Sequence, residues 1–250
     1  AGRNHVMAID RAAKRALADA GADFSDVDAV AVTCGAGLVG CLLVGVSYAK
    51  ALAYSLGVPL VAVNHIEAHM CANYLGTDAE PPYLCILASG GHTAVVHVAG
   101  YNEYSVLSST VDDAIGEAFD KVARTLGLPY PGGPQIDRLS ESGKPVYRLP
   151  SPLLKNGNLS YSGLKTAVVN LMHNAAQRNE ALDAADLSAS FSRAAIDPLL
   201  SVAEKHLKRL GLKTLALAGG VAANGYLRGE AQRLSQRTGI RVLLPEKKLC

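Results

Sequence analysis

Residues 83–98 read YLCILASGGHTAVVHV and contain two apolar segments separated by four small or polar residues. Both segments are short and rich in Val, Ile and Leu, which favours β-strands over residues 83–88 and 93–98. The intervening SGGH predicts a tight turn between them. A third strand is expected at 104–109. These three strands form a predicted β-meander from which the rest of the fold can be worked out.

The segments before the meander predict helices and buried strands. An amphipathic helix is expected at 5–20, strands at 28–34 and 60–63, and a helix at 39–56. The helix at 39–56 is apolar almost all round, so we expect it to lie inside the molecule. It is interrupted by Ser47, Lys50 and Ser55 and falls short of the ~20 residues needed to cross a bilayer, so we expect a soluble protein with no membrane contact.

The segments after the meander predict mainly helices. These are expected at 112–126, 136–142, 162–177 and 184–210. Asp112 is expected to cap the first of them. The PYPGGP segment at 129–134 is expected to be irregular, and residues 143–160 to form a long loop.

The end of the chain predicts a strand, a glycine turn and a helix in succession. The strand is expected at 214–218, followed by Gly219-Gly220, a helix at 222–237 and a last strand at 241–244. The order of all these elements predicts an α/β protein with mixed sheets flanked by helices. Glycine turns at strand ends are where phosphates and nucleotides usually bind, although no Walker or GxGxxG pattern is present.

Composition and charge narrow the class of protein. The 250 residues are 49% hydrophobic and 18% charged, with a mean hydropathy of +0.16, which excludes a disordered chain. Five cysteines without a CxxC pair favour reduced thiols over a disulfide framework. The net charge of +2 is uneven, because residues 1–150 carry −5 and residues 151–250 carry +7. The basic segment could face a polyanion or be an ordinary solvated surface.

His65 and His69 are the strongest candidates for metal ligands. They are four residues apart after a predicted strand, so on a helix both imidazoles lie on one face. The HIEAH string is similar to the HExxH motif of zinc peptidases. However, Glu67 comes two residues after His65, about 200° round the helix, and would point away from a shared metal. Two ordinary histidines remain the alternative.

Three further motifs could bind a ligand. The turn SGGHT at 89–93 offers backbone N–H groups and hydroxyls, and GGVAAN at 219–224 exposes the start of a helix. Asp120 is unexpected late in its predicted helix, where a negative charge opposes the helix dipole. The following PGGP would allow close approach of a flat ligand. Each motif alone is weak, since plain turns and helix starts look the same.

Taken in order, six motifs resemble those of the TsaD family. They are NHIEAH (64–69), SGGHT (89–93), DAIGEAFDK (113–121), YPGGP (130–134), SGLKT (162–166) and GGVAAN (219–224). The wording GEAFDK is similar to the bacterial and organellar branch. The resemblance implies an actin-like ATPase (ASKHA) fold of two lobes, with residues 1–80 in the first lobe, including the metal-binding helix, and 81–250 in the second.

The resemblance also implies an activity and its site. Family members are tRNA N6-adenosine threonylcarbamoyltransferases, which pass a threonylcarbamoyl group from threonylcarbamoyl-AMP to N6 of adenosine 37 in tRNAs that read ANN codons. His65 and His69 match the ligands of one divalent metal ion, Fe²⁺ or Zn²⁺. The adenylate-binding positions match Ala88, Ser89, Gly90, Gly91, His92, Asp120, Gly133, Asp137 and Asn224.

The resemblance further implies partners, a compartment and a departure from the family. The partners would be tRNA and TsaB/TsaE-like proteins of the same machinery, or a second copy of the chain, in the cytoplasm or the mitochondrial matrix. Family members carry a phosphate loop before residue 1 and a third metal ligand after Cys250, so we expect a truncated, impaired chain. A metallopeptidase and a non-catalytic nucleotide-binding scaffold are the alternative functions.

Overall fold

The computed structural model describes residues 2–250 and divides the chain into two units. The first unit ends at Ala68 and the second begins at His69, within helix α3 (His65–Gly76), whereas the sequence places the boundary after residue 80. Contacts explain this position: Asn73 Nδ2 on α3 donates to the Leu217 carbonyl at 3.1 Å. The greater part of α3 thus packs with the second unit.

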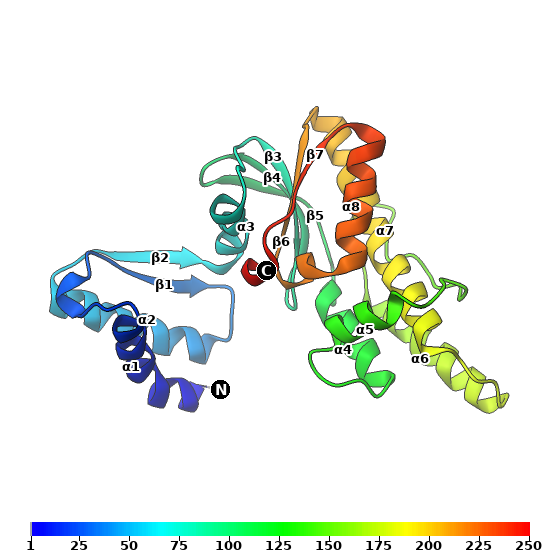
Figure 1. The fold of residues 1–250 in the computed structure, drawn as a ribbon, viewed down its shortest axis with the longest axis horizontal. Helices are drawn as coiled ribbons and strands as arrows, with labels where there is room; N and C mark the ends of the chain where they lie inside the picture. The colour runs from blue at the N-terminus through cyan, green and yellow to red at the C-terminus, as the bar shows by residue number, and fades with distance from the viewer. Residues whose placement is uncertain (1) are drawn as a thin grey trace. The chain divides into compact units, whose positions relative to one another are not determined.

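The first unit is a small βαβ arrangement. Strand β1 (Val30–Gly35) pairs in parallel with β2 (Leu60–Asn64), and α2 (Val39–Leu56) connects them. A parallel pair requires such a crossover, because a tight hairpin can only join antiparallel strands. Helix α2 lies against β1, and α1 (Gly2–Asp19) packs on α2 (Figure 1). A 3₁₀ turn, η1 (Phe24–Asp26), precedes β1.

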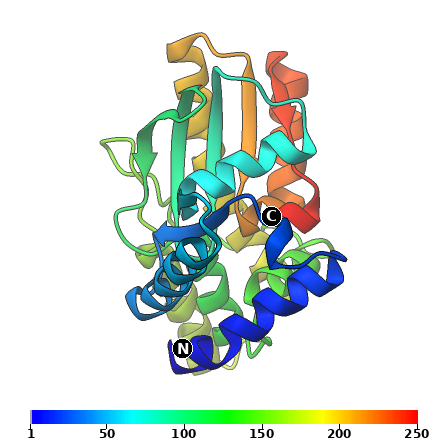
Figure 2. The ribbon, with the colours of Figure 1, turned by 90° about the vertical axis from the view of Figure 1, so that its left-hand side faces the viewer.

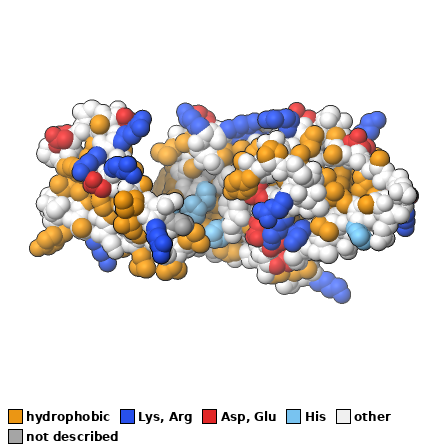
Figure 3. Space-filling view, turned by 90° about the horizontal axis from the view of Figure 1, so that it is seen from below, with side chains coloured by type: hydrophobic (Ala, Val, Ile, Leu, Met, Phe, Trp, Pro, Cys, Tyr) orange, Lys and Arg blue, Asp and Glu red, His pale blue; other side chains and the backbone are white. Residues whose placement is uncertain are grey.

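The prediction that α2 lies inside the molecule is wrong. Within α2 only Ala49 and Ala53 are buried, whereas Leu43 is 61% and Tyr54 is 91% exposed. Its bounds are those expected, but β1 and α1 cover only part of its circumference within residues 2–250. By length and composition alone α2 is the one described helix that could cross a membrane, which is weak evidence for a span. Figure 3 shows hydrophobic side chains over this unit.

The second unit is built on a five-stranded mixed sheet. Strands β3 (Tyr83–Ala88), β4 (Thr93–Gly100) and β5 (Glu103–Ser109) form the predicted antiparallel meander. Strands β6 (Thr214–Ala218) and β7 (Arg241–Leu243) continue the sheet in parallel beside β3, which gives the order β5-β4-β3-β6-β7. The central strand β3 is buried along its whole length, because strands pair with it on both sides and helices cover the sheet.

Helices cover both faces of this sheet. Helix α3 crosses one face, and α7 (Ala184–Leu210) and α8 (Gly225–Thr238) lie behind the other (Figure 2). Helices α4 (Ile115–Thr125), α5 (Gly132–Ser140) and α6 (Ser162–Gln177) lie beyond one end of the sheet. Two 3₁₀ turns, η2 (Gly220–Ala223) and η3 (Lys247–Leu249), complete the fold. The core includes the perpendicular ring pair of Phe119 and Phe191, 4.9 Å between centroids.

Asp112 does not cap α4, contrary to the prediction. The N-cap of α4 is Ala114, and the hydroxyl oxygen of Thr93 accepts a hydrogen bond from the Ile115 backbone N–H at 2.8 Å. The Asp112 carboxylate instead accepts from Ser160 Oγ at 2.5 Å, Ser162 Oγ at 2.6 Å and the Tyr161 N–H at 2.8 Å. It therefore ties the end of the long loop at 143–160 to the segment that precedes α4.

The PYPGGP segment is partly regular, which also differs from the prediction. Helix α5 begins at Gly132, so Gly133 and Pro134 lie in its first turn. Proline is tolerated there because its missing N–H would have no partner within the helix. The Gly132 N–H is instead satisfied by Asp120 Oδ1 at 2.7 Å. This carboxylate reaches α5 from α4, which the local sequence does not reveal.

Candidate adenylate pocket and histidine pair

A pocket of about 620 Å³ lies in the second unit where three glycine-containing segments meet. These segments are the turn after β3, the start of α5 and the η2 turn after β6. The lining residues are Gly90, Gly116, Phe119, Asp120, Tyr130, Pro131, Gly133, Pro134, Asp137, Arg138, Glu141, Gly220, Val221, Ala223, Asn224 and Lys247. The C-terminal ends of parallel β3 and β6 lead into it, the usual place for a ligand in an α/β sheet.

The pocket brings together five of the nine residues predicted to bind adenylate. Gly90, Asp120, Gly133, Asp137 and Asn224 all line it. The other four predicted residues, which do not line it, are Ala88, Ser89, Gly91 and His92. The family resemblance assigns the whole segment from Ala88 to His92 to the adenylate, whereas only Gly90 of this segment lines the pocket.

The turn after β3 is held closed by its own hydrogen bonds. The Ser89 N–H donates to the His92 carbonyl at 2.8 Å, and the His92 N–H donates to Ser89 Oγ at 3.1 Å. Ser89 is 6% exposed, and Ala88 is fully buried at the end of β3. The Ser89 hydroxyl therefore serves the turn, and the residue does not line the pocket.

Two glycines are required where the segments pack together beneath the pocket. Gly219 has φ +87°, and a Cβ there would lie 2.5 Å from the Ala88 carbonyl oxygen. A Cβ at Gly116 would lie 2.6 Å from the Ser89 carbonyl oxygen. Both distances are shorter than non-bonded contact allows, so any other residue would push the β3 turn away from η2 or from α4. The shape of the pocket thus depends on these two positions.

Three other glycines face the pocket for a different reason. Gly90, Gly133 and Gly220 line it, yet a Cβ built at any of them meets no protein atom within 4 Å. Packing therefore does not require glycine at these positions. Each absent side chain leaves space inside the pocket and lets a ligand approach the backbone closely. This arrangement is that of a ligand cradle.

Two pocket carboxylates, those of Asp120 and Asp137, lie at helix N-termini. Asp120 Oδ1 accepts from the first N–H of α5, and Asp137 Oδ2 accepts from the Gly225 N–H of α8 at 2.8 Å. Negative charges are stabilised there by the helix dipoles and by the unpaired backbone N–H groups. Asp137 Oδ1 also accepts from the Tyr226 N–H, at 3.4 Å. Each carboxylate oxygen has two lone pairs, so the two groups can still accept hydrogen bonds from ligand hydroxyls.

Asn224 is the N-cap of α8 and is 8% exposed. Its Oδ1 accepts from the Leu227 N–H at 2.9 Å, and α8 begins at Gly225 instead of at 222 as the sequence predicts. The side-chain oxygen of Asn224 thus caps the helix. Its NH₂ group can still donate a hydrogen bond to a ligand.

Several pocket residues were not predicted from the sequence. Tyr130 is 83% exposed and lines the pocket beside Pro131, and Lys247 brings a cation from the last 3₁₀ turn. Tyr130 directly precedes PGGP, so an exposed aromatic next to a predicted site for a flat ligand was a signal that could have identified it. Lys247 is 27 residues from Gly220, and no local pattern connects the two.

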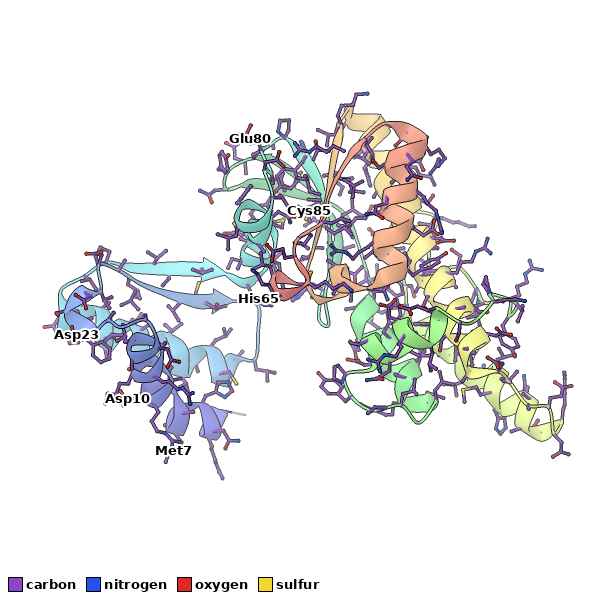
Figure 4. The ribbon with its side chains drawn as sticks, in the orientation of Figure 1. Met7, Asp10, Asp23, His65, Glu80 and Cys85 are labelled. Atoms are coloured by element: carbon purple, nitrogen blue, oxygen red, sulfur yellow. The ribbon has the colours of Figure 1, made fainter. Side chains whose placement is uncertain are left out.

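His65 and His69 lie one turn apart on α3, as predicted. Helix α3 begins directly after β2, where Figure 4 labels His65, and Asn64 Oδ1 accepts from the Ile66 N–H at 2.8 Å to fix this start. Both histidines are half-buried. Their i, i+4 spacing places the imidazoles on one face, whereas Glu67 lies about 200° away. Neither histidine lines the pocket.

The histidine pair fits a metal ion only in part. Two imidazoles on one helix face suit zinc or ferrous iron, but a stable site needs at least three protein ligands. Residues 2–250 hold no group of three His, Cys, Asp or Glu side chains placed to bind one ion. Two imidazoles alone are too few for a stable site.

Cys85 is not a competing catalytic nucleophile. Cys85 is fully buried in β3 inside the second unit (Figure 4). Burial raises the pKa of the Cys85 thiol to about 12, so it stays protonated and unreactive at neutral pH.

Comparison with known proteins places the chain in a family. The family described as TsaD, tRNA N6-adenosine threonylcarbamoyltransferase, matches residues 1–250. A protein of that name from Clostridium perfringens (strain SM101 / Type A) is 48% identical over 254 residues, which cover 100% of this chain and 75% of that protein. The chain belongs to the TsaD family. A protein of the same name from Bacillus subtilis (strain 168) is 47% identical to this chain, and the match covers 100% of this chain and 73% of that protein.

Solved structures confirm the fold class. The chain is similar to full-length HypF in its phosphate- and nucleotide-bound form, with a TM-score of 0.63 and 15% identity, covering 87% of this chain and 43% of HypF. It is also similar to component A of the (R)-2-hydroxyglutaryl-CoA dehydratase of Acidaminococcus fermentans, with a TM-score of 0.53 and 15% identity, covering 90% of this chain and 73% of that one. At this identity the likeness shows the fold alone, which is the predicted actin-like ATPase (ASKHA) fold.

Proposed function

We propose that this TsaD family member transfers the threonylcarbamoyl group of threonylcarbamoyl-AMP to N6 of adenosine 37 in tRNAs that read ANN codons, and that the 620 Å³ pocket holds the adenylate. One observation carries the assignment of the pocket. Three glycines that packing does not require line a cavity that also contains two carboxylates at helix N-termini. Open glycine backbone suits a phosphate, and carboxylates suit ribose hydroxyls.

The pocket residues would divide the adenylate between them. The carboxylates of Asp120 and Asp137 would accept hydrogen bonds from the ribose with the lone pairs that their bonds to the helix N–H groups leave available. The exposed ring of Tyr130 would pack against the flat adenine. Backbone near Gly90 and Gly220 would admit the phosphate, with the Lys247 ammonium among the lining groups to offset its charge.

The chemistry requires positioning more than a covalent enzyme intermediate. The N6 amine of adenosine attacks the carbonyl carbon of the threonylcarbamoyl group, the bond from that carbon to the phosphate oxygen breaks, AMP leaves, and N6 loses a proton. An amine conjugated with a purine ring is a weak nucleophile, so much of the rate must come from holding the two reactants together. The pocket residues contribute by fixing the adenylate that carries the donor carbonyl.

His65 and His69 would supply two ligands to a divalent ion, Fe²⁺ or Zn²⁺. When bound, such an ion acts as a Lewis acid that polarises the donor carbonyl. To test the ligands, the His65→Ala protein should be loaded with Zn²⁺ or Fe²⁺ and its metal content measured by mass spectrometry. The content should fall well below that of the wild type, whereas His173→Ala on α6 should leave it unchanged. Equal metal content in the wild type and both variants would refute the assignment of His65 and His69 as metal ligands.

The activity itself is tested with the other components of the reaction. Purified chain, threonylcarbamoyl-AMP, tRNA and TsaB/TsaE-like proteins are combined, and modified adenosine is measured by mass spectrometry. Formation of modified adenosine that depends on the chain, even at a reduced rate, supports the transferase, and its complete absence with active partner proteins would contradict it. The partner proteins, a second copy of the chain and a cytoplasmic location stay predictions.

The alternative function, a metallopeptidase, is disfavoured by helix geometry. Glu67 lies about 200° round α3 from His65, so it would point away from a metal shared by His65 and His69.

A further inference from the structure

A second pocket, of about 290 Å³, shares no lining residue with the adenylate pocket among residues 2–250. It lies between the end of β5, the loop at 153–157 and the last three turns of α7. We call it the basic pocket, because its charged lining residues are Lys155, Lys205 and Arg209. All three belong to residues 151–250, which carry a net charge of +7.

Among the residues that the structure describes, no carboxylate lines the basic pocket. Lys205 and Arg209 are four residues apart on one face of α7, where like charges repel each other and destabilise a helix. The neighbouring Glu204 does not neutralise them, because its carboxylate binds Lys208 Nζ at 2.7 Å and Arg237 at 2.8 Å. The positive charge of the pocket is therefore uncompensated by any described lining residue.

The floor of the basic pocket is held in place by hydrogen bonds. His206 Nε2 and Ser108 Oγ are 3.0 Å apart and join α7 to β5. Burial lowers the pKa of His206, so this imidazole is neutral at neutral pH and adds no charge. In the loop, Asn158 Oδ1 accepts from the Ser109 N–H at 3.1 Å, and Asn156 Oδ1 accepts from the Asn158 N–H. Lys155 thus projects from an ordered turn.

Helix electrostatics explain only part of this cluster. Cations in the last turn of a helix offset its dipole, and Lys208 and Arg209 occupy that position in α7. Lys205 lies a turn earlier, and Lys155 comes from a different segment across the pocket. Three cations from two segments around one cavity are arranged as for an anion that bridges them.

We propose that the basic pocket binds a phosphate group, either of an RNA backbone or of a small phosphate compound. Lysine and arginine are the residues that neutralise phosphates, and Ser108 and Asn156 add polar groups to the same lining. The RNA source rests on the proposed function, because a tRNA substrate brings a backbone to the protein. Binding is measured without turnover, so a failure of the pocket is distinct from a failure of the transferase.

The test removes the three charges and keeps a polar side chain at each position. The variant is Lys155→Gln, Lys205→Gln, Arg209→Gln, and the control is Arg124→Gln, Lys144→Gln, Arg178→Gln, three exposed cations that line none of the described pockets. Both variants remove the same net charge, and thermal melting checks that both fold. The probes are tRNA at several KCl concentrations and inorganic phosphate.

The results show whether the phosphate belongs to RNA or to a small compound, or whether the basic pocket binds no phosphate. If an RNA backbone binds, the pocket variant weakens tRNA binding about tenfold or more and lowers the salt slope by about one for each cation that no longer meets a phosphate, while the control changes less. If a small phosphate compound binds, only the affinity for inorganic phosphate falls in the pocket variant. Unchanged binding of both probes, or equal weakening in the control, would show that the basic pocket is not a phosphate site.

Discussion

The two units of this chain use similarly apolar sequences in opposite ways. In the second unit β3 is buried along its whole length, and residues from five helices share one core. In the first unit, among the described residues up to Ala68, only Ala49 and Ala53 are buried, although α2 is strongly hydrophobic. Apolar composition therefore does not by itself predict burial, because the number of elements that pack around a segment decides it.

This difference in burial indicates that most of the stability of the described chain comes from the second unit. Each fully buried large apolar side chain contributes roughly 1.5–3 kcal/mol, and such side chains occur almost entirely in the second unit. The same unit holds the adenylate pocket, whose walls are core elements. We expect substitutions in the second unit to cost much and those on α2 to cost little.

The largest expected effect is a core truncation. Phe191→Ala in α7 removes a fully buried ring that packs on Phe119 and should lower the free energy of unfolding by about 3–5 kcal/mol. Leu43→Ala on α2, where the side chain is 61% exposed, should change it by about 0.5 kcal/mol or less. Urea denaturation followed by circular dichroism measures both. Comparable losses would abolish the contrast between the units.

A pair of adjacent glycines sharpens the comparison inside the second unit. Gly219→Ala places a Cβ against the Ala88 carbonyl at positive φ and should destabilise by about 2–4 kcal/mol. Gly220→Ala adds the same methyl group to open space and should leave the melting temperature almost unchanged. Thermal unfolding compares them. A similar melting temperature for both variants would mean that the pocket floor is not packed as described.

Asp112 tests whether the long loop belongs to the same stable unit. Burial raises the pKa of the Asp112 carboxyl, whereas hydrogen bonds from Ser160, Ser162 and the Tyr161 N–H lower it. Together these hydrogen bonds outweigh the burial, so the pKa lies below its ordinary value. The carboxylate thus stabilises the fold above its ordinary pKa of ~3.9, and this is lost as the pH falls below it. Asp112→Ala should cost about 2 kcal/mol at neutral pH.

The control for Asp112 is Asp28→Ala, an exposed carboxylate of the first unit. Denaturation at pH 7 and at pH 3 should show a loss for Asp112→Ala that shrinks in acid, and almost none for Asp28→Ala. A loss of the same size at both pH values would show that the charge of Asp112 does not anchor the loop.

The smallest expected effect comes from an ion network on the surface of the second unit. Arg237 and Lys208 lower the pKa of Glu204 to about 2, so its stabilising contribution is present above ~4.5 and is lost as the pH falls toward 2. Because both cations are exposed, Glu204→Gln should cost only about 1 kcal/mol at pH 7. Denaturation from pH 7 to 2 measures the loss, and no convergence with the wild type in acid would contradict it.

The elements that sequence reasoning located well are those with local signals. The helices at 39–56, 162–177 and 184–210 have the predicted bounds. Local end signals mark two of them, namely Gly57 after the first, and Asp183 before and Gly211 after the last. The strands of the meander also start at or near the predicted residues. The motifs that resemble the family predicted which residues form the site, and two of these residues, Gly90 and Asp120, line the pocket.

The predictions that failed depended on contacts between distant segments. Asp112 bonds to residues about 50 positions later, and Asp120 starts α5 from the preceding helix. The exposure of α2 depends on what packs around it, which its own sequence does not encode. Lys247 reaches the pocket only through the order of the sheet strands.

The central claim is that the pocket of the second unit binds adenylate, and calorimetric titration with AMP tests it most directly. Gly220→Ala adds a methyl group inside the pocket, and Gly229→Ala on α8 adds one outside it in open space. We predict that AMP binds the wild type and Gly229→Ala with similar affinity and binds Gly220→Ala at least about tenfold more weakly, a loss of about 1.4 kcal/mol. Equal affinity for all three proteins would contradict the account.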